Sequence, residues 1–166
     1  GEIGEICVSG PVVTTEYKEE PEHTKAAKIY DGDRIWHRMG DLGYFDSAGR
    51  LWFCGRKSHR VICKDKGILF PVPCEAIFNQ HDAVFRSALV GVNGEPIIII
   101  EATKLKSIDI ETVVSELYGL GQDSPVTKMI RQFLFHPDFP VDVRHNAKID
   151  RIKLGAWAKT QDPIGV

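Results

Sequence analysis

Several features that would assign a protein to a special class are missing from this sequence. Its 166 residues include 21 Lys and Arg against 23 Asp and Glu, so the net charge is only −2. A balance this even excludes a protein that coats nucleic acid by bulk charge or binds membranes through a polybasic surface. The longest clean apolar run, residues 97–100, is far shorter than the roughly 18–20 residues of a membrane-spanning helix. We therefore expect no transmembrane segment and no nucleic-acid partner.

Cysteine is also scarce. The four cysteines are Cys7, Cys54, Cys63 and Cys74, at irregular spacings without a C-x-x-C pair. A chain of this length builds a core without disulfides, so a reduced, cytoplasmic protein is the simpler interpretation. Three of the cysteines and His59 could ligate a structural zinc ion, but the paired short spacings of zinc fingers are absent. We expect buried apolar cysteines instead and predict no metal site.

The beginning of the chain has no targeting pattern. It starts at Gly1 with no methionine, no basic segment and no apolar segment. A secretory signal peptide requires the last two of these features, so none is predicted. The missing methionine favours the interpretation that the sequence is a fragment of a longer protein.

The first part of the chain is predicted to be β-rich. Strands are expected at residues 5–9, 36–39, 42–46 and 51–54. Gly49 supplies the turn between the last two strands, which makes them a hairpin. A short helix is expected over residues 21–27, where Pro21 occupies the first turn. This β subdomain ends near residue 57, where the composition changes.

The second part mixes short strands with helices. Strands are expected at residues 61–62, 68–70, 88–92, 97–102 and 132–135, and helices around residues 75–79, 110–117 and 149–157. Asn93-Gly94 between two apolar runs favours a type I′ hairpin turn, and Gly119 is expected to stop the second helix. The predicted fold class is α+β: the end of a small β-barrel-like subdomain (1–56), then a compact C-terminal domain (57–166) with a β-hairpin, a short sheet and about three helices.

Two residues stand out as candidates for chemistry. Asp41 lies between Gly40 and Gly43, which allow close backbone approach, and its carboxylate could accept two hydrogen bonds from a ribose diol. A turn-forming aspartate is the alternative. Lys148 lies where a loop meets a helix, so its ammonium could reach a phosphate or a carboxylate. A solvated lysine at a helix start is the alternative.

Three longer motifs occur in order along nearly the whole chain. They read G-E-I-G-E-I-x-V-x-G-P and P-E-x-T within residues 1–24, M-G-D-L-G-Y-F-D-x-x-G-x-L-x-F-x-G-R at residues 39–56, and R-H-N-A-K-I-x-R at residues 144–151. Together they resemble the motifs of the adenylate-forming superfamily, which includes acyl-CoA synthetases, the adenylation domains of nonribosomal peptide synthetases, and beetle luciferases. Glu16 departs from the family pattern, which usually has glycine there.

The resemblance implies roles for the matching residues. Asp41 would hold the ribose hydroxyls of ATP, with Arg56 nearby and Phe53 packing beside the nucleoside. Lys148 would be the catalytic residue, contacting the α-phosphate and the substrate carboxylate and stabilising the charge that develops during adenylation.

The resemblance also implies a moving second domain. Lys57 and Ser58 match the hinge about which that domain rotates between the two half-reactions. The hinge position usually holds Asp or Lys, and here it is Ser58 with Lys57 adjacent. Gly67 would be the loop glycine that enters the site in the second half-reaction, although the interval from Arg56 is about two residues longer than usual.

The implied activity is that of an ATP-dependent, AMP-forming acid ligase. The upstream phosphate-gripping loop and the Y-G-x-T-E motif of the family are absent, so the chain is expected to need the upstream N-terminal domain and to be inactive alone. ATP and Mg²⁺ are implied cofactors, and CoA is left open. Residues 36–41, 51–61 and 139–149 look most similar to the bacterial olefin-biosynthesis branch, which closes β-hydroxy fatty acids into β-lactones, so other enzymes of such a pathway are implied as partners.

Other functions remain open at this stage. The runner-up is a conventional long-chain fatty acyl-CoA ligase or a peptide-synthetase adenylation domain. A further alternative is a non-catalytic module, in which the basic residues between 56 and 66 and between 144 and 153 dock a nucleic acid or an acidic protein.

Overall fold

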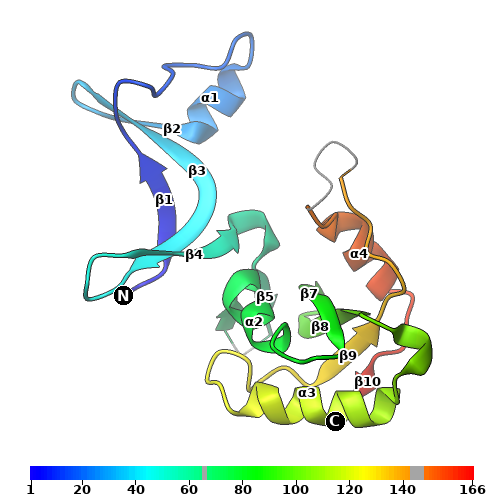
Figure 1. Cartoon of the computed structure of the whole chain (residues 1–166). Helices are drawn as coiled ribbons and strands as arrows, with labels where there is room; N and C mark the ends of the chain where they lie inside the picture. Colours follow the sequence, from blue (N-terminus) through cyan, green and yellow to red (C-terminus); the bar gives the residue numbers. More distant parts are fainter. Residues whose placement is uncertain (65–66, 143–147) are drawn as a thin grey trace. The chain divides into compact units, whose positions relative to one another are not determined.

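A computed structural model describes residues 1–64, 67–142 and 148–166. The contacts divide the chain into two compact units, Gly1–Ser58 and His59–Val166 (Figure 1). Each unit is described by itself below.

The first unit is an antiparallel sheet with one short helix. In chain order it contains β1 (Gly4–Val8), α1 (Pro21–Ala27), β2 (Lys28–Asp31), β3 (Arg34–Phe45) and β4 (Leu51–Arg56). The long strand β3 is central, because β1, β2 and β4 all pair with it (Figure 1). The strands expected at 36–39 and 42–46 are therefore one strand. Gly40 has a φ of +67°, so the strand changes direction there without ending.

Asp46 closes the β3–β4 hairpin with four hydrogen bonds. Its Oδ1 accepts from the backbone N–H groups of Ala48 and Arg50, both at 2.9 Å. Its Oδ2 accepts from Arg50 Nε at 2.7 Å and from the indole Nε1 of Trp52 at 2.8 Å. These donors, with Trp52 first and the Arg50 N–H second, lower the pKa of Asp46 from 3.8 to about 2. The hairpin predicted around Gly49 is confirmed, and this carboxylate holds its turn through two backbone N–H groups.

The lowered pKa predicts how the hairpin responds to acid. A carboxyl whose pKa is depressed by folding stabilises the folded state above its unfolded pKa, and that stabilisation is lost as the pH falls toward about 2. We expect the NMR shift of the Trp52 indole N–H to titrate with a midpoint near pH 2, while the Trp36 indole shows no such step. A Trp52 midpoint near pH 4 would contradict the assigned hydrogen bond.

The second unit is a four-stranded sheet with helices on both faces. Its elements are β5 (Val61–Cys63), β6 (Gly67–Leu69), α2 (Pro71–Phe78), β7 (Val84–Val92), β8 (Glu95–Ala102), α3 (Ile110–Gln122), β9 (Gln132–Phe135), α4 (Arg151–Ala158) and β10 (Ile164–Gly165), with a 3-10 turn at Leu105–Ser107. Another 3-10 turn, Lys57–His59, contains the last residues of the first unit and the first residue of the second. The strand order is β10-β9-β8-β7, with β8 and β9 parallel. The α+β class is confirmed, and the described part of this unit contains the three expected helices.

The β7–β8 hairpin follows its sequence signal. Asn93 and Gly94 have φ values of +53° and +83°, as a type I′ turn requires at both central positions. Pro96 lies next to the first residue of β8, where a missing N–H is tolerated.

Alternating residues of this hairpin fill two separate cores. On one face, Leu89, Ile98 and Ile100 pack with residues of α2 and α3. On the other face, Ala88, Val90, Ile97 and Ile99 pack with Leu154 and Ala158 of α4. The sheet therefore separates α2 and α3 from α4, as the period of two along each strand requires.

The expected stop of α3 at Gly119 is wrong. The helix continues to Gln122, because its apolar face reaches one turn further, to the buried Gly121. A Cβ on Gly121 would lie 3.2 Å from the ring of Phe78, whereas a Cβ on Gly119 would meet nothing within 4 Å. Gly121 thus permits close packing of α3 on α2 rather than ending the helix.

Alanine at these two glycines should have opposite effects. Gly119→Ala removes a flexible residue from an exposed helix interior and should raise the free energy of unfolding by about 0.5–1 kcal/mol. Gly121→Ala should lower it by about 1–3 kcal/mol, because the fully buried Phe78 ring packs edge-on against Phe133 at 5.7 Å and cannot retreat. Urea unfolding of both variants tests this, and equal stabilisation by the two alanines would contradict the packing role.

The four cysteines form no disulfide, and Cys54, Cys63 and Cys74 are buried. Burial raises the pKa of the Cys74 thiol to about 12, so this side chain behaves as a small apolar residue. Within the described ranges, no three His, Cys, Asp or Glu side chains converge in a way that could hold a metal ion. No helix in those ranges is both long enough and apolar enough to cross a bilayer.

Candidate functional site

Asp41 lies in the second half of β3, opposite Arg56 in β4. Arg56 Nε is 3.2 Å from Asp41 Oδ1, and Arg56 Nη1 donates a hydrogen bond to the Met39 carbonyl at 2.9 Å. Asp41 Oδ1 is covered, yet among the described residues it accepts no hydrogen bond, since the contact with Arg56 lacks hydrogen-bond geometry. A covered acceptor without a donor costs about 1–3 kcal/mol. This carboxylate therefore has acceptor capacity that the first unit leaves unused.

The glycines beside Asp41 are required by the backbone. Gly40 has a positive φ, which a residue with a Cβ adopts only with strain. A Cβ on Gly43 would lie 2.7 Å from the Trp52 carbonyl oxygen, at a point where the β3–β4 register shifts. Together they bend β3 and bring β4 close, which places Arg56 against Asp41.

Phe53 lies in β4, three residues before Arg56. This residue is 49% exposed, although phenylalanine is usually buried. The same unit therefore carries Asp41, Arg56 and an exposed aromatic side chain on the paired strands β3 and β4.

The end of the first unit is tied to its first strand by a shared carboxylate. Glu5 Oε2 accepts from Arg38 Nη2 at 2.6 Å and from Lys57 Nζ at 2.8 Å. Arg38 first and Lys57 second lower the pKa of Glu5. Lys57 is thus anchored to β1, one residue before Ser58, at which the contacts of the first unit end. The hinge role of Lys57 and Ser58 stays a prediction.

Lys148 belongs to the second unit and precedes α4. Val141 and Ile149 form an antiparallel bridge, the Asp142 N–H donates to the Lys148 carbonyl at 3.0 Å, and the Asp150 N–H donates to the Pro140 carbonyl at 2.7 Å. These contacts make a strap, residues 140–142 bonded to residues 148–150, that holds the backbone of Lys148. The remaining motif residues, 144–147, lie outside the described residues.

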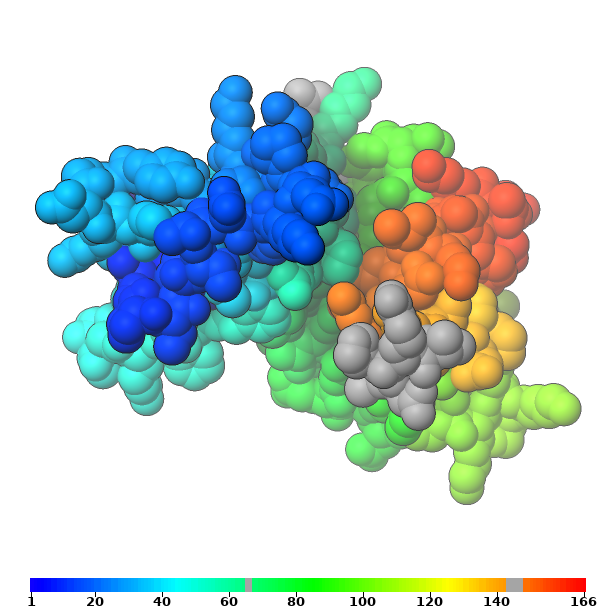
Figure 2. All heavy atoms as spheres, turned by 90° about the horizontal axis from the view of Figure 1, so that it is seen from above, coloured from blue at the N-terminus to red at the C-terminus, as the bar shows by residue number. Residues whose placement is uncertain are grey.

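The Lys148 side chain is exposed and lines a surface depression of about 450 Å³. Lys153 and His59 line the same depression. Figure 2 shows α4, in orange, at the surface of the second unit, and the first residues of this helix form part of the rim. An ammonium there can meet an anion that enters from solvent.

Sequence reasoning missed the partner of Arg151, the last residue of the motif at 144–151. Arg151 forms a bidentate pair with Glu75 of α2, with N···O distances of 2.6 and 2.8 Å. No periodicity could reveal this contact, because 76 residues separate the two side chains. The local signal in the sequence is a glutamate, Glu75, within an otherwise apolar helix.

Gly67 begins β6 opposite Cys63, with a φ of +90°. That φ explains why glycine occupies the position. Its proposed part in a second half-reaction stays a prediction, since residues 65–66 lie outside the described residues.

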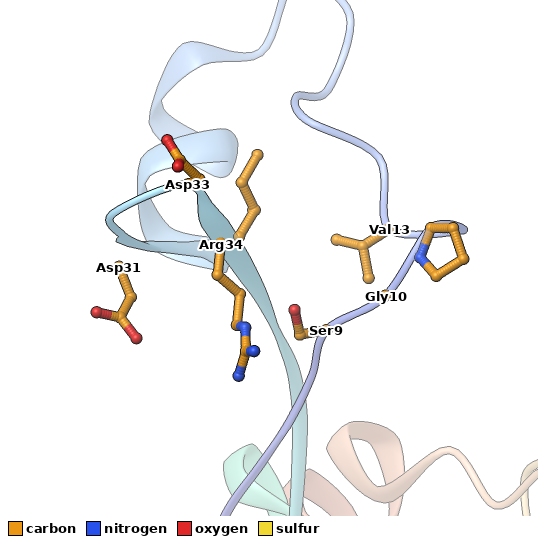
Figure 3. Close-up of a pocket in the computed structure, with 8 residues that line it drawn as sticks. Ser9, Gly10, Val13, Asp31, Asp33 and Arg34 are labelled. Carbon is orange, nitrogen blue, oxygen red and sulfur yellow. The ribbon is translucent and has the colours of Figure 1, made fainter.

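A further depression belongs to the first unit (Figure 3). It has a volume of about 690 Å³ and lies between the end of β1 and the turn from β2 to β3. Arg34 in its wall has its guanidinium 5.5 Å from the Trp36 ring. All the labelled residues are exposed or half-exposed, so nothing in this open surface selects a ligand, and none of the predicted site residues lines it.

Comparisons with known proteins agree with the motifs. A scan against models of protein families finds no match. The chain is similar to the olefin beta-lactone synthetases of Xanthomonas campestris and Stenotrophomonas maltophilia, with 45% and 44% identity, each over 97% of the chain. It spans only 31% and 30% of these two relatives. Among solved structures, the ATP-bound MatB of Rhodopseudomonas palustris is similar with a TM-score of 0.78 and 28% identity, over 96% of this chain and 31% of its own.

Proposed function

Since this chain belongs to the adenylate-forming superfamily, we propose that it is the C-terminal portion of an ATP-dependent, AMP-forming synthetase. The proposed substrate is a β-hydroxy fatty acid, which the enzyme activates as an acyl-adenylate and then closes into a β-lactone. The similarity to olefin beta-lactone synthetases along nearly the whole chain supports this choice. Because the chain spans less than a third of those relatives, we expect it to act only together with an upstream N-terminal domain.

The observation that carries the proposal is the unused acceptor of Asp41. The hydroxyls of a ribose are donors that a carboxylate binds in pairs, and the guanidinium Nε of Arg56 lies 3.2 Å from this carboxylate. Arg56 is itself half-exposed, with 48% of its side chain accessible, so it can shift when a ligand arrives. The exposed ring of Phe53 in the same strand pair offers a surface for the nucleoside. The residues present therefore fit a nucleotide.

Lys148 is proposed to act on the reacting groups. Its ammonium would bind the α-phosphate and the substrate carboxylate together, which lowers their mutual repulsion and orients the carboxylate oxygen toward phosphorus. The carboxylate oxygen bonds to the α-phosphorus, and the bond to pyrophosphate breaks. In the second step the β-hydroxyl oxygen bonds to the acyl carbon, its proton goes to solvent, and AMP leaves with the bonding electrons.

The other requirements follow from the same chemistry. Mg²⁺ is proposed to arrive with the phosphates of ATP, which it normally accompanies. CoA is not needed for lactone closure, and a long-chain acyl-CoA ligase is the second candidate. We propose a cytoplasmic location, which four cysteines without a disulfide support.

ATP–pyrophosphate exchange by the complete synthetase that carries this chain tests the proposal. A long-chain fatty acid and its β-hydroxy analogue are offered in turn, with and without CoA. We expect exchange with the β-hydroxy acid and a lactone product without CoA. Formation of a CoA thioester when CoA is added, with no lactone when it is omitted, would support the acyl-CoA ligase instead. An absence of exchange with every acid would refute the adenylation function.

A further inference from the structure

The pair formed by Glu75 and Arg151 connects the two helical layers of the second unit. Glu75 lies in α2 and Arg151 begins α4, and the two helices pack on opposite faces of the sheet. Both side chains are nearly buried, with exposures of 11% and 15%. The two N···O distances of 2.6 and 2.8 Å are those of a bidentate charge-assisted contact.

The same pair occupies the open edge of the sheet. β7 is the last strand in the order, so alternate backbone groups along it have no strand partner. At Leu89 the N–H donates to Glu75 Oε1 at 2.8 Å, and the carbonyl accepts from Arg151 Nη1 at 3.4 Å. The Glu75 carboxylate thus binds the N–H of Leu89 in β7, and the Arg151 guanidinium binds its carbonyl. Arg151 is therefore bonded to the strand β7 as well as to the helix α2.

Arg151 is only three residues from Lys148, and backbone hydrogen bonds hold the segment between them. The Asp150 N–H is bonded to the Pro140 carbonyl, and the Lys148 carbonyl is bonded to the Asp142 N–H. Asp150 also accepts the Lys153 N–H at 3.1 Å and so begins α4 as its N-cap. The strap is therefore held at one end by a helix start that Glu75 and Arg151 fix in place.

We propose that Glu75 and Arg151 are positioning residues for Lys148, an inference that rests on the function proposed above. The Lys148 side chain is exposed, so the position of its backbone determines which atoms its ammonium can contact. A displacement of about 1 Å at a reacting group can cost about 100-fold in rate. Without the bidentate contact, the first turn of α4 would lose its polar link to Leu89 and Glu75. The apolar packing of Leu154 and Ala158 would then hold the helix on the sheet.

A purely structural role makes a different prediction. Buried ion pairs usually add little net stability over a well-packed neutral replacement, whereas removal of one partner leaves a buried charge uncompensated. A structural role therefore predicts that single variants lose stability and lose both reaction steps equally, whereas a positioning role predicts loss of the first step alone. Replacing both charges by amides removes the uncompensated buried charge, because the two introduced glutamine side chains would have the donors and acceptors needed for Leu89 and for each other. That double variant should fold normally and regain most of the geometry.

The test uses Glu75→Gln, Arg151→Gln and the double variant in the complete synthetase. Each single variant should lower kcat for pyrophosphate exchange by about 100-fold, with the KM for ATP changed less than about twofold. The double variant should recover to within about tenfold of the wild type. The second step, started from a supplied acyl-adenylate, should keep its rate in all variants. Glu116→Gln is the matched control, because it neutralises a glutamate that contacts His81 at 3.0 Å rather than Arg151.

Amide hydrogen exchange gives a second readout that needs no activity. In the 166-residue chain, Arg151→Gln should speed exchange at the Asp142 and Asp150 amides by about tenfold or more relative to the control, since opening of the strap sets that rate. If single variants fail to fold, the double variant and Arg151→Lys, which keeps the charge but not the bidentate contact, decide the question.

The outcomes distinguish this inference from the proposed function. The positioning role alone would be overturned if the wild type catalyses pyrophosphate exchange and the single variants do so at the same rate. It would also be overturned if the single variants lose equal rate in the adenylation step and in the second step. Strap amides that exchange as slowly in Arg151→Gln as in Glu116→Gln would overturn it as well. A wild-type enzyme with no exchange for any acid would refute the function on which the inference rests.

Discussion

Replacement of Lys148 by alanine should reduce adenylate formation by about 10²–10³-fold, the typical cost of removing one group that stabilises transition-state charge. The side chain is exposed and lines the depression beside α4, so the fold should not depend on it. The backbone bond from the Asp142 N–H to the Lys148 carbonyl does not involve the side chain and is kept. The loss should therefore appear in kcat for ATP–pyrophosphate exchange and not in thermal stability.

Lys153→Ala is the matched control for this variant. Lys153 lines the same depression and has an exposed side chain that pairs with Asp150 at 3.3 Å, a surface contact of small energetic value. It should retain near wild-type exchange. Equal losses in the two variants would mean that the depression needs only positive charge, and full activity of Lys148→Ala would remove Lys148 from the proposed site.

Asp41→Asn should weaken use of ATP by about 10–100-fold in kcat/KM. Hydrogen bonds to a charged group contribute about 1.5–3 kcal/mol each, and an amide can accept only at its single oxygen. The substitution keeps the shape of the side chain, so the β3–β4 register around Asp41 and Arg56 should remain. Steady-state kinetics with ATP as the varied substrate measure the effect.

Two controls make the Asp41 result specific. Asp33→Asn changes an exposed carboxylate in the same unit, beside the open depression of Figure 3, and should leave ATP kinetics unchanged. Deoxy analogues of ATP test the proposed contact from the ligand side. They should be poor substrates for the wild type but no worse than ATP for Asp41→Asn. The substitution and the missing hydroxyl remove the same hydrogen bond, so their effects should not add. Additive losses would contradict a contact between Asp41 and the ribose.

Local patterns in the sequence determined most of the secondary structure. Asn93-Gly94 specifies a turn through the φ values that these residues tolerate, and the i, i+3, i+4, i+7 spacing from Ile110 to Leu117 specifies the buried face of α3. Such patterns act through neighbouring residues, so they can be read without the fold. The expected strands at 42–46 and 51–54 were too short, because the structure extends both and pairs Asp41 with Arg56.

The errors occurred where distant residues overrule a local signal. Glycines such as Gly119 and Gly121 are typical of a helix end. Here α3 continues past Gly119, and the glycine at 121 allows close packing on Phe78. The same reason explains β3, in which Gly40 bends a strand that three neighbours keep paired. Propensity is a small free energy for each residue, and tertiary packing outweighs it.

The sequence by itself determined the identity of Asp41, Phe53, Arg56 and Lys148 as candidate residues, because a motif records residue types at fixed spacing. Only the tertiary structure decided which groups support them. The covered oxygen of Asp41 without a hydrogen bond and the contact between Glu75 and Arg151 depend on where separate segments meet. Hydrogen bonds and ion pairs act over a few ångströms in space, so residues far apart in the chain are matched only once the sheet and its two helical layers have formed.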